Sequence, residues 1–245
     1  MKAMIFAAGC GTRLKPITDT TPKALIEIGG HSLLELVLRK MAYSGIRDIV
    51  VNVHHHSQQI IRFLLQNRFP GLNISISDES GKLLDTGGGL KKAASLLAGE
   101  EPILLHNVDV ISNISFSELE TAFRQSGVMA MMAVKDRPST RQLVFDDDLI
   151  LKGWINHQSG ESISIGVQPE HPHLLSFSGI SIVSPDLPHT LPMKGVFGLV
   201  PALLKLADKN PVKAFTKDHR WIDVGKPESL GQAVSHINTY YKKFL

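Results

Sequence analysis

The stretch Ala3-Met4-Ile5-Phe6-Ala7-Ala8-Gly9-Cys10-Gly11-Thr12-Arg13-Leu14 organises the rest of the chain. Its apolar start predicts a buried strand, and the glycines that follow predict a turn. Gly9 and Gly11 allow positive φ angles and let a ligand approach the backbone without meeting a Cβ atom. The N–H groups of such a turn can point together at an anion. Arg13 and the later Lys23 add positive charge, so we expect a polyphosphate to bind here.

Two common phosphate-binding motifs do not fit this turn. A P-loop needs Gly, four residues and then Gly-Lys-Ser/Thr, and the chain contains no such pattern. The dinucleotide fingerprint needs a third glycine where Leu14 stands, together with an acidic residue after a second strand. Neither motif therefore explains the turn.

The stretch Ala7-Ala8-Gly9-Cys10-Gly11-Thr12-Arg13-Leu14, followed by Pro16 and Thr21-Pro22-Lys23-Ala24-Leu25, resembles the signature of the sugar-1-phosphate nucleotidyltransferases, which make nucleotide sugars. The resemblance covers most of the chain. It implies an α/β, Rossmann-like three-layer fold in a single domain of residues 1–245. It also implies catalytic roles for Arg13 and Lys23. The nucleotide contacts that it implies in this stretch come from Ala8, Gly9, Gly11, Thr12 and Arg13.

The hydrophobic pattern supports this fold class independently. Ser32-Leu33-Leu34-Glu35 is a capping box that predicts a helix ending near Gly45, and a β-rich run follows at 48–53. The same order repeats in predicted helices from Ser57 and at 89–97, and in predicted strands at 73–77 and 103–106. Such alternation predicts a mostly parallel central sheet covered by helices.

The second half of the chain predicts further elements with the same logic. The patterns indicate helices at 115–127 and 196–207 and a last helix that reaches Tyr241. They indicate strands at 128–134, 174–183 and 220–225, a hairpin at 142–154 and an irregular connection at 155–172. We interpret Asp146-Asp147-Asp148 as the solvated turn of the hairpin, and His54-His55-His56 as a loop that leads into the helix at Ser57.

Composition narrows the class of partner. The 245 residues are 43% apolar and 20% charged, which is ordinary for a globular protein. The net charge is +3 without a block of like charges, so neither a nucleic acid nor a membrane partner is required. Only one cysteine, Cys10, and no run long enough to span a bilayer are present, so we expect a cytoplasmic protein. We expect a monomer or small homo-oligomer.

Two aspartates follow predicted buried strands. Asp109 comes just after 103–106, and Asp223 lies at the end of the strand in Trp221-Ile222-Asp223-Val224-Gly225. Strand ends at one sheet edge would present both carboxylates to a crevice. The resemblance implies that Asp109 and Asp223 hold Mg²⁺, which prefers hard oxygen ligands.

Other substrate contacts are implied by the same resemblance. In Asp85-Thr86-Gly87-Gly88-Gly89, the glycines before the predicted helix would leave amides free for a nucleobase. The nucleotide contacts implied outside the glycine turn are Thr86, Gly87, Gly88 and Asn107. Ser178 and Gly179 are the implied sugar contacts.

The chain departs from the family pattern at two places. Relatives usually have Asn-Gly-Asp where this chain has Asn107-Val108-Asp109, and a β-branched Val does not readily take positive φ. Many relatives also carry Glu-Lys-Pro before the sugar-facing strand. We find no equivalent lysine beyond Lys152, a loose candidate for the sugar phosphate contact.

The length and the Thr86-Gly87-Gly88-Gly89 segment look most like bacterial enzymes that use N-acetylmuramate 1-phosphate with UTP. Enzymes that use mannose or heptose 1-phosphate with GTP are the alternative. The expected partners are therefore an NTP (UTP or GTP) and a sugar 1-phosphate. A catalytically degenerate regulator that binds a nucleotide sugar is the non-enzymatic alternative.

Overall fold

The computed structural model describes residues 1–241 and 244. The strands are β1 Lys2–Phe6, β2 Glu27–Ile28, β3 His31–Ser32, β4 Asp48–Val53, β5 Asn73–Asp78, β6 Ile103–Asn107, β7 Val110–Ser112, β8 Ala130–Lys135, β9 Arg141–Phe145, β10 Leu151–Asn156, β11 Ser162–Ser164, β12 His173–Val183, β13 Val212–Phe215 and β14 Trp221–Asp223. The α-helices are α1 Leu33–Tyr43, α2 Ser57–Gln66, α3 Asp85–Lys92, α4 Ala94–Leu97, α5 Phe116–Ser126, α6 Leu187–Thr190, α7 Leu199–Leu206 and α8 Ser229–His236. Short 3₁₀ turns at Thr12–Leu14, Ile17–Asp19 and Lys23–Leu25 follow β1, and a π-helical segment, Ile237–Tyr241, continues α8.

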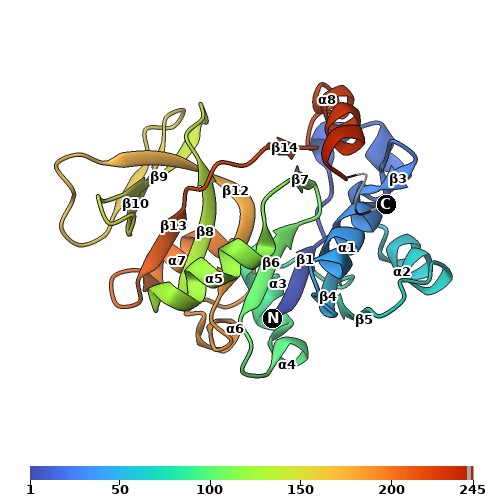
Figure 1. The fold of residues 1–245 in the computed structure, drawn as a ribbon, viewed down its shortest axis with the longest axis horizontal. Helices are drawn as coiled ribbons and strands as arrows, with labels where there is room; N and C mark the ends of the chain where they lie inside the picture. The colour runs from blue at the N-terminus through green and yellow to red at the C-terminus, as the bar shows by residue number, and fades with distance from the viewer. Residues whose placement is uncertain (242–243, 245) are drawn as a thin grey trace.

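A single large sheet forms the centre of the molecule, in the order β11-β10-β9-β12-β6-β1-β4-β5, with β8 joining β12 and β13 joining β8. Strands β6, β1, β4 and β5 run parallel, as the alternation predicts. Strand β12 pairs antiparallel with β6, β8 and β9, and so extends the parallel part. Figure 1 shows β9 and β10 at one end of the molecule and α2 with β5 at the other.

Helices cover both faces of the sheet, which gives the three layers that the resemblance implies. Alternate residues of β1 point to opposite faces, so Ile5 belongs to one apolar core and Met4 to the other. The first core includes residues of α1, α2, α5 and α8, and the second includes residues of α3, α4, α6 and α7. Strands β1, β4 and β6 are therefore buried on both faces, which explains their mainly apolar sequences, whereas the edge strand β5 alternates polar and apolar residues.

Two predicted helix starts are confirmed in atomic detail. The Ser32 hydroxyl accepts the Glu35 backbone N–H at 3.1 Å, and the Ser115 hydroxyl accepts that of Glu118 at 3.3 Å. Each satisfies a backbone donor that the first helical turn leaves free. At the end of α5, Gly127 takes the left-handed conformation, with a φ of 64°.

Some predicted boundaries were wrong. Helix α3 begins at Asp85 rather than Gly89, so the glycine run lies inside the helix. The irregular connection at 155–172 contains strand β11, which pairs with β10. Strand β13 was not predicted, because its four residues carry too short a pattern to separate from a loop. The helix predicted at 196–207 starts later, at Leu199. The acidic triplet lies in the hairpin turn after β9, as predicted, and Asp146 accepts the Ile150 N–H there.

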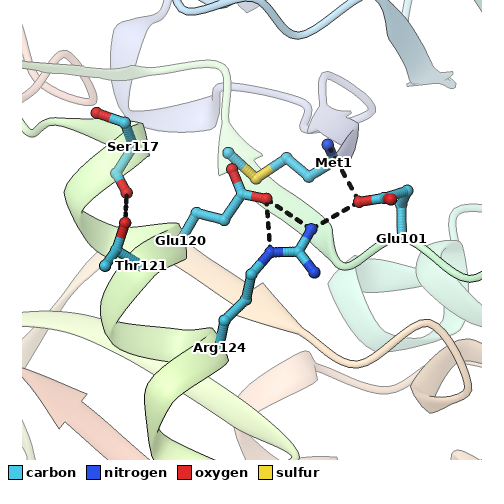
Figure 2. A network of polar contacts seen from close by, with 6 residues as sticks. All are labelled: Met1, Glu101, Ser117, Glu120, Thr121 and Arg124. Carbon is cyan, nitrogen blue, oxygen red and sulfur yellow. Dashed lines mark hydrogen bonds and ion pairs between the residues drawn. The ribbon is translucent and has the colours of Figure 1, made fainter.

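A surface network of ion pairs connects α5 with the residues that lead into β1 and β6. Arg124 donates to Glu120 at 2.8 Å and to Glu101 at 2.6 Å, and Glu101 also lies 3.6 Å from the Met1 ammonium group. Figure 2 shows Arg124 between the two carboxylates. Each exposed pair of this kind contributes at most about 1 kcal/mol.

Among residues 1–241 and 244, no helix combines the length and the apolar character needed to cross a membrane.

Candidate active site

The parallel strands β1 and β6 are neighbours, and the chain leaves their carboxyl ends toward the same edge of the sheet. In open α/β sheets a ligand binds outside the strand ends where the strand order reverses. Here the chain passes from β1 outward through β4 to β5 and then returns to β6 on the other side of β1, so the strand order reverses between β1 and β6. A cavity of about 260 Å³ lies at this point, and we call it the glycine-turn cavity. Its lining includes Gly9, Gly11, Thr12, Arg13, Lys23, Thr86, Asn107 and Asp109.

The glycines shape this cavity in different ways. A side chain on Gly9 would meet no atom within 4 Å, so this residue presents open backbone to the cavity. Gly11 has a φ of +64°, and a Cβ there would lie 2.8 Å from Thr18. Its carbonyl accepts the Thr18 hydroxyl at 3.0 Å. Only glycine fits this position without strain, whereas Gly9 is free for ligand approach.

Two ion pairs connect the glycine-turn cations with the two aspartates. Lys23 Nζ contacts the Asp109 carboxylate, and both side chains are largely buried. Arg13 lies 3.9 Å from Asp223 and is more exposed. The four charged residues selected from the sequence therefore lie together, although Asp223 is far from the others along the chain.

The two aspartates are brought together by backbone pairing. Strand β14 pairs antiparallel with β7, and the Val224 N–H donates to the Asp109 carbonyl at 2.8 Å. Burial and, after it, the nearby Asp109 charge raise the pKa of Asp223 above its ordinary value. Both causes disfavour the ionised carboxylate. A bound cation would reverse this penalty.

The residues fit a magnesium ion. Asp223 Oδ1 is buried and has no hydrogen-bond partner among the described residues, so an acceptor oxygen is left for another ligand. Within the described part of the chain, no group of three or more His, Cys, Asp or Glu side chains could hold a metal. Mg²⁺ commonly uses one or two carboxylates and completes its shell with water and phosphate oxygens. Asp109 and Asp223 are sufficient in that arrangement.

A second cavity, of about 480 Å³, adjoins the first, and we call it the Asp223 cavity. Arg13, Asn107 and Asp109 line both cavities. The Asp223 cavity is further lined by Arg137, Ser139, Thr140, Gly179, Trp221, Asp223 and Lys226. The two cavities therefore adjoin at their three shared residues.

The sequence matches the family described as Nucleotidyl transferase over residues 2–143. N-acetylmuramate alpha-1-phosphate uridylyltransferase of Caulobacter vibrioides is 31% identical over 93% of this chain and 93% of its own length. The chain belongs to the sugar-1-phosphate nucleotidyltransferase family. Mannose-1-phosphate guanyltransferase of Yarrowia lipolytica is 29% identical over 99% of this chain but only 66% of its own length.

The fold agrees with this family. The structure of UDP-glucose pyrophosphorylase from Acinetobacter baumanii superposes with a TM-score of 0.79 at 19% identity. The match covers 99% of this chain and 95% of that chain. At this identity the likeness shows the shared fold.

One basic residue of this nucleotidyltransferase was missed from the sequence. Arg137 lines the Asp223 cavity, and its guanidinium carbon lies 4.2 Å from the Trp221 ring centre. It donates to the Phe177 carbonyl at 3.2 Å, while its buried Nε has no described partner. Burial lowers the pKa of Arg137 from its usual value, although nearby Asp223 opposes the shift. The order Asp136-Arg137-Pro138 could have revealed it, because it matches Glu-Lys-Pro in charge and proline position.

The glycine run differs from the sequence prediction. The N–H groups of Gly87 and Gly88 both donate to the Phe197 carbonyl, at 2.9 and 3.0 Å, so they are not free. A Cβ on Gly87 would lie 2.5 Å from the Phe197 ring. Glycine is required here for close packing against the 195–198 segment. Thr86 does line the glycine-turn cavity, as its proposed nucleotide contact requires.

The two implied sugar contacts occupy different environments. Gly179 lines the Asp223 cavity, with a φ of +74°. Ser178 is fully buried; its hydroxyl lies 3.3 Å from His219 Nε2, and its carbonyl accepts the Trp221 indole N–H at 2.6 Å. Ser178 therefore positions Trp221 and, through the ring, Arg137. Ala8 is likewise buried and outside the cavity linings, although its own chain neighbour Gly9 is inside.

The two departures from the family pattern have structural explanations. Val108 is absent from the residues with positive φ, and its N–H donates to the Phe6 carbonyl at 3.2 Å. The turn after β6 therefore does not need glycine in this chain. Lys152 lies 3.3 Å from Asp146 at the hairpin and lines neither cavity. The structure therefore gives no support to a contact between Lys152 and the sugar phosphate.

The histidine triplet forms the loop before α2. His54 Nδ1 contacts the Glu79 carbonyl at 2.7 Å, and His55 Nε2 contacts the Thr18 carbonyl at 3.1 Å. His56 takes the left-handed conformation at the helix start, with a φ of 50°. These contacts hold the segments that flank the glycine turn.

Proposed function

We propose that this enzyme joins an NTP to a sugar 1-phosphate, giving a nucleotide sugar and pyrophosphate, and that its preferred reaction is uridylyl transfer to N-acetylmuramate 1-phosphate. The observation that supports it most directly is the meeting of two cavities at Asp109, with Arg13, Lys23 and Asp223 around the junction. The nucleotide would occupy the glycine-turn cavity. The sugar phosphate would occupy the Asp223 cavity.

The reaction forms one bond and breaks one bond. An oxygen of the sugar 1-phosphate attacks the α-phosphorus of the NTP, and the bond from that phosphorus to the β-phosphate bridging oxygen breaks, so that pyrophosphate leaves. The attacking phosphate is already ionised at neutral pH, and no general base is needed. Catalysis therefore depends on alignment of two anions and on compensation of their charge.

The chain's own residues supply these requirements. Arg13 and the glycine-turn amides would bind the triphosphate, and Lys23 would neutralise the charge that reorganises at the α-phosphate. Asp109 and Asp223 would hold Mg²⁺, which shields the phosphate charges when bound. Lys23 now pairs with Asp109, so this lysine already lies beside the proposed metal ligand.

We infer that Arg137 binds the phosphate of the sugar 1-phosphate. It lines the Asp223 cavity, and no carboxylate of the described residues forms an ion pair with it. Its guanidinium group lies over the Trp221 ring, and a guanidinium group suits bidentate contact with a phosphate. Gly179 would face the sugar.

Two features support the choice of an acidic sugar. Two relatives with near-complete mutual coverage act on N-acetylmuramate 1-phosphate according to their names. Arg13, Arg137 and Lys226 line the Asp223 cavity opposite only two carboxylates, which would themselves be neutralised by the metal. N-acetylmuramate carries a carboxylate beyond its phosphate, whereas mannose and heptose are neutral. Guanylyl transfer to those sugars is the alternative, and the mannose-1-phosphate guanyltransferase relative supports it.

A panel that crosses UTP, GTP, ATP and dTTP with N-acetylmuramate, mannose, heptose and glucose 1-phosphates tests this proposal. Pyrophosphate release and the nucleotide sugar are measured together, with and without Mg²⁺. We expect the highest kcat/KM for UTP with N-acetylmuramate 1-phosphate. A preference for GTP with a neutral sugar would favour the alternative. Nucleotide-sugar binding without turnover in any pair would identify a degenerate regulator instead.

A further inference from the structure

A buried polar pair lies behind the glycine turn and belongs to neither cavity lining. Asn52, at the end of β4, and Glu79, just after β5, are 2% and 1% exposed. Asn52 Nδ2 donates to Glu79 Oε1 at 2.7 Å. Within the described part of the chain, no cation forms an ion pair with Glu79. A carboxylate in such a place is costly unless its oxygens are well hydrogen-bonded.

This pair connects two backbone segments that line the same cavity. The Ala7 N–H, at the start of the glycine turn, donates to Asn52 Oδ1 at 2.7 Å. The Leu84 N–H, one residue before α3, donates to Glu79 Oε2 at 3.0 Å. Two residues beyond each amide lie Gly9 and Thr86, which both line the glycine-turn cavity.

The sequence of α3 leaves room for this connection. A Cβ on Gly89 would lie 2.6 Å from Glu79 Oε1 and 2.9 Å from Asn52 Nδ2. The third glycine of the run thus makes space for the buried pair rather than for a ligand. The direction of all three hydrogen bonds is fixed. The Ala7 and Leu84 amides can only donate, so Asn52 must accept with its oxygen and donate to Glu79 with its nitrogen.

We propose that Asn52 and Glu79 are positioning residues, which hold the glycine turn and the start of α3 at the separation that the nucleotide requires. This inference rests on the proposed binding of nucleotide in the glycine-turn cavity. The pair acts through the Ala7 and Leu84 amides and touches no reacting atom. Its loss would therefore weaken NTP binding more than sugar phosphate binding.

An exchange of the two side-chain types provides the test. In Asn52→Asp, two carboxylates face one another; in Glu79→Gln, one carbonyl oxygen must serve two donors. In the double variant Asn52→Asp/Glu79→Gln, the new Asp accepts from Ala7 and from the new Gln, whose oxygen accepts from Leu84. All three hydrogen bonds and the net charge are restored. A matched control is the Asn73→Asp/Asp48→Asn exchange, because Asn73 Nδ2 donates to Asp48 at 2.9 Å on the same two strands, at their exposed starts.

We expect each single variant to raise the KM for the NTP about tenfold, because loss of one charge-assisted hydrogen bond has an effect of this size. The KM for the sugar phosphate should stay within about twofold of the wild-type value. The double variant should return to within about threefold of the wild type. Calorimetric titration of the nucleotide alone should follow the same order, whereas the Asn73 and Asp48 variants should not differ from wild type.

Folded single variants with an unchanged KM for the NTP, or a folded double variant without recovery, would overturn the inference. If the single variants do not fold, Gly89→Ala tests it by displacing Glu79 without removing a polar group; an unchanged nucleotide affinity in folded Gly89→Ala would be equally decisive against it. A wild-type enzyme that binds no NTP would instead contradict the proposed function.

Discussion

The Lys23 ammonium group contacts the carboxylate of Asp109, across the junction of the two cavities. The side chains are 10% and 20% exposed, so solvent screens their interaction only in part. Asp109 also disfavours ionisation of Asp223, as the raised pKa of Asp223 indicates. Lys23 therefore compensates a site that gathers two carboxylates before any cation binds.

Replacement of Lys23 by Ala should lower kcat by about 10²- to 10³-fold, if Lys23 acts as one preorganised transition-state donor. Steady-state pyrophosphate release measures this effect. Lys15→Ala is the control, because Lys15 lies on the same segment but pairs with exposed Asp19. Activity of Lys23→Ala within about threefold of wild type would exclude this role.

Asp109→Asn and Asp223→Asn should each keep the fold and lose most Mg²⁺-dependent activity. Each removes one of the two carboxylates that fit the metal, so higher Mg²⁺ should restore activity only in part. The measurements are circular dichroism and a Mg²⁺ titration of turnover. Full activity of Asp223→Asn at low Mg²⁺ would contradict the metal assignment.

Gly87→Val and Gly9→Ala should distinguish a glycine that is needed for packing within the protein from one that leaves room for the nucleotide. The sequence alone predicts that Gly87→Val acts on the KM for the NTP, but the Phe197 ring lies 2.5 Å from the new Cβ. We therefore expect loss of stability by roughly 1–3 kcal/mol or more, as for other overpacked sites. Gly9→Ala meets no protein atom and should raise the KM for the NTP without a change in Tm. The opposite pattern would mean that Gly87 faces the nucleotide.

Arg137→Ala should raise the KM for the sugar phosphate about tenfold or more, because it removes a charge-assisted contact. The KM for the NTP should change little. Arg137→Lys should recover only part of the affinity, since an ammonium group lacks the planar fork. Lys152→Ala, which removes the cation paired with Asp146, should leave both KM values unchanged. An equal loss of sugar phosphate affinity in Arg137→Ala and Lys152→Ala would indicate a general effect of charge.

The stability of the fold should fall below neutral pH because of His106. Burial first and the nearby Lys40 charge second lower the pKa of His106 to about 3. An unfolded histidine binds a proton near pH 6.5, whereas folded His106 stays neutral, so stability decreases as pH falls from about 6.5 towards 3. Each pH unit in this window costs up to about 1.4 kcal/mol. Urea unfolding at pH 7.5 and 5 should show a smaller difference for His106→Gln; an identical difference would remove His106 as the cause.

The sequence was sufficient for the parts of the site that depend on local pattern. The apolar run and the glycines after it predicted β1 and its turn, and capping boxes located α1 and α5, because these features involve residues within a few positions of one another. The alternation of strand and helix patterns also predicted the parallel strands. Burial on both faces makes β1, β4 and β6 mainly apolar, whereas the edge strand β5 alternates polar and apolar residues. Asp109 and Asp223 could be selected as strand-end carboxylates, and the structure brings them together.

Other features depend on contacts between distant segments. The Phe197 carbonyl accepts the Gly87 and Gly88 amides from more than a hundred residues away, and this contact decided that the glycines serve packing. Arg137 lines the Asp223 cavity beside Trp221, which Ser178 holds, and these residues are far apart along the chain. The hydrogen bond between Asn52 and Glu79 likewise joins β4 to the residue after β5, and the same two side chains bind the Ala7 and Leu84 amides. A pattern of residues specifies the elements that can form, but side-chain surroundings arise only when those elements pack, and these surroundings determine whether a polar group faces a ligand or the protein itself.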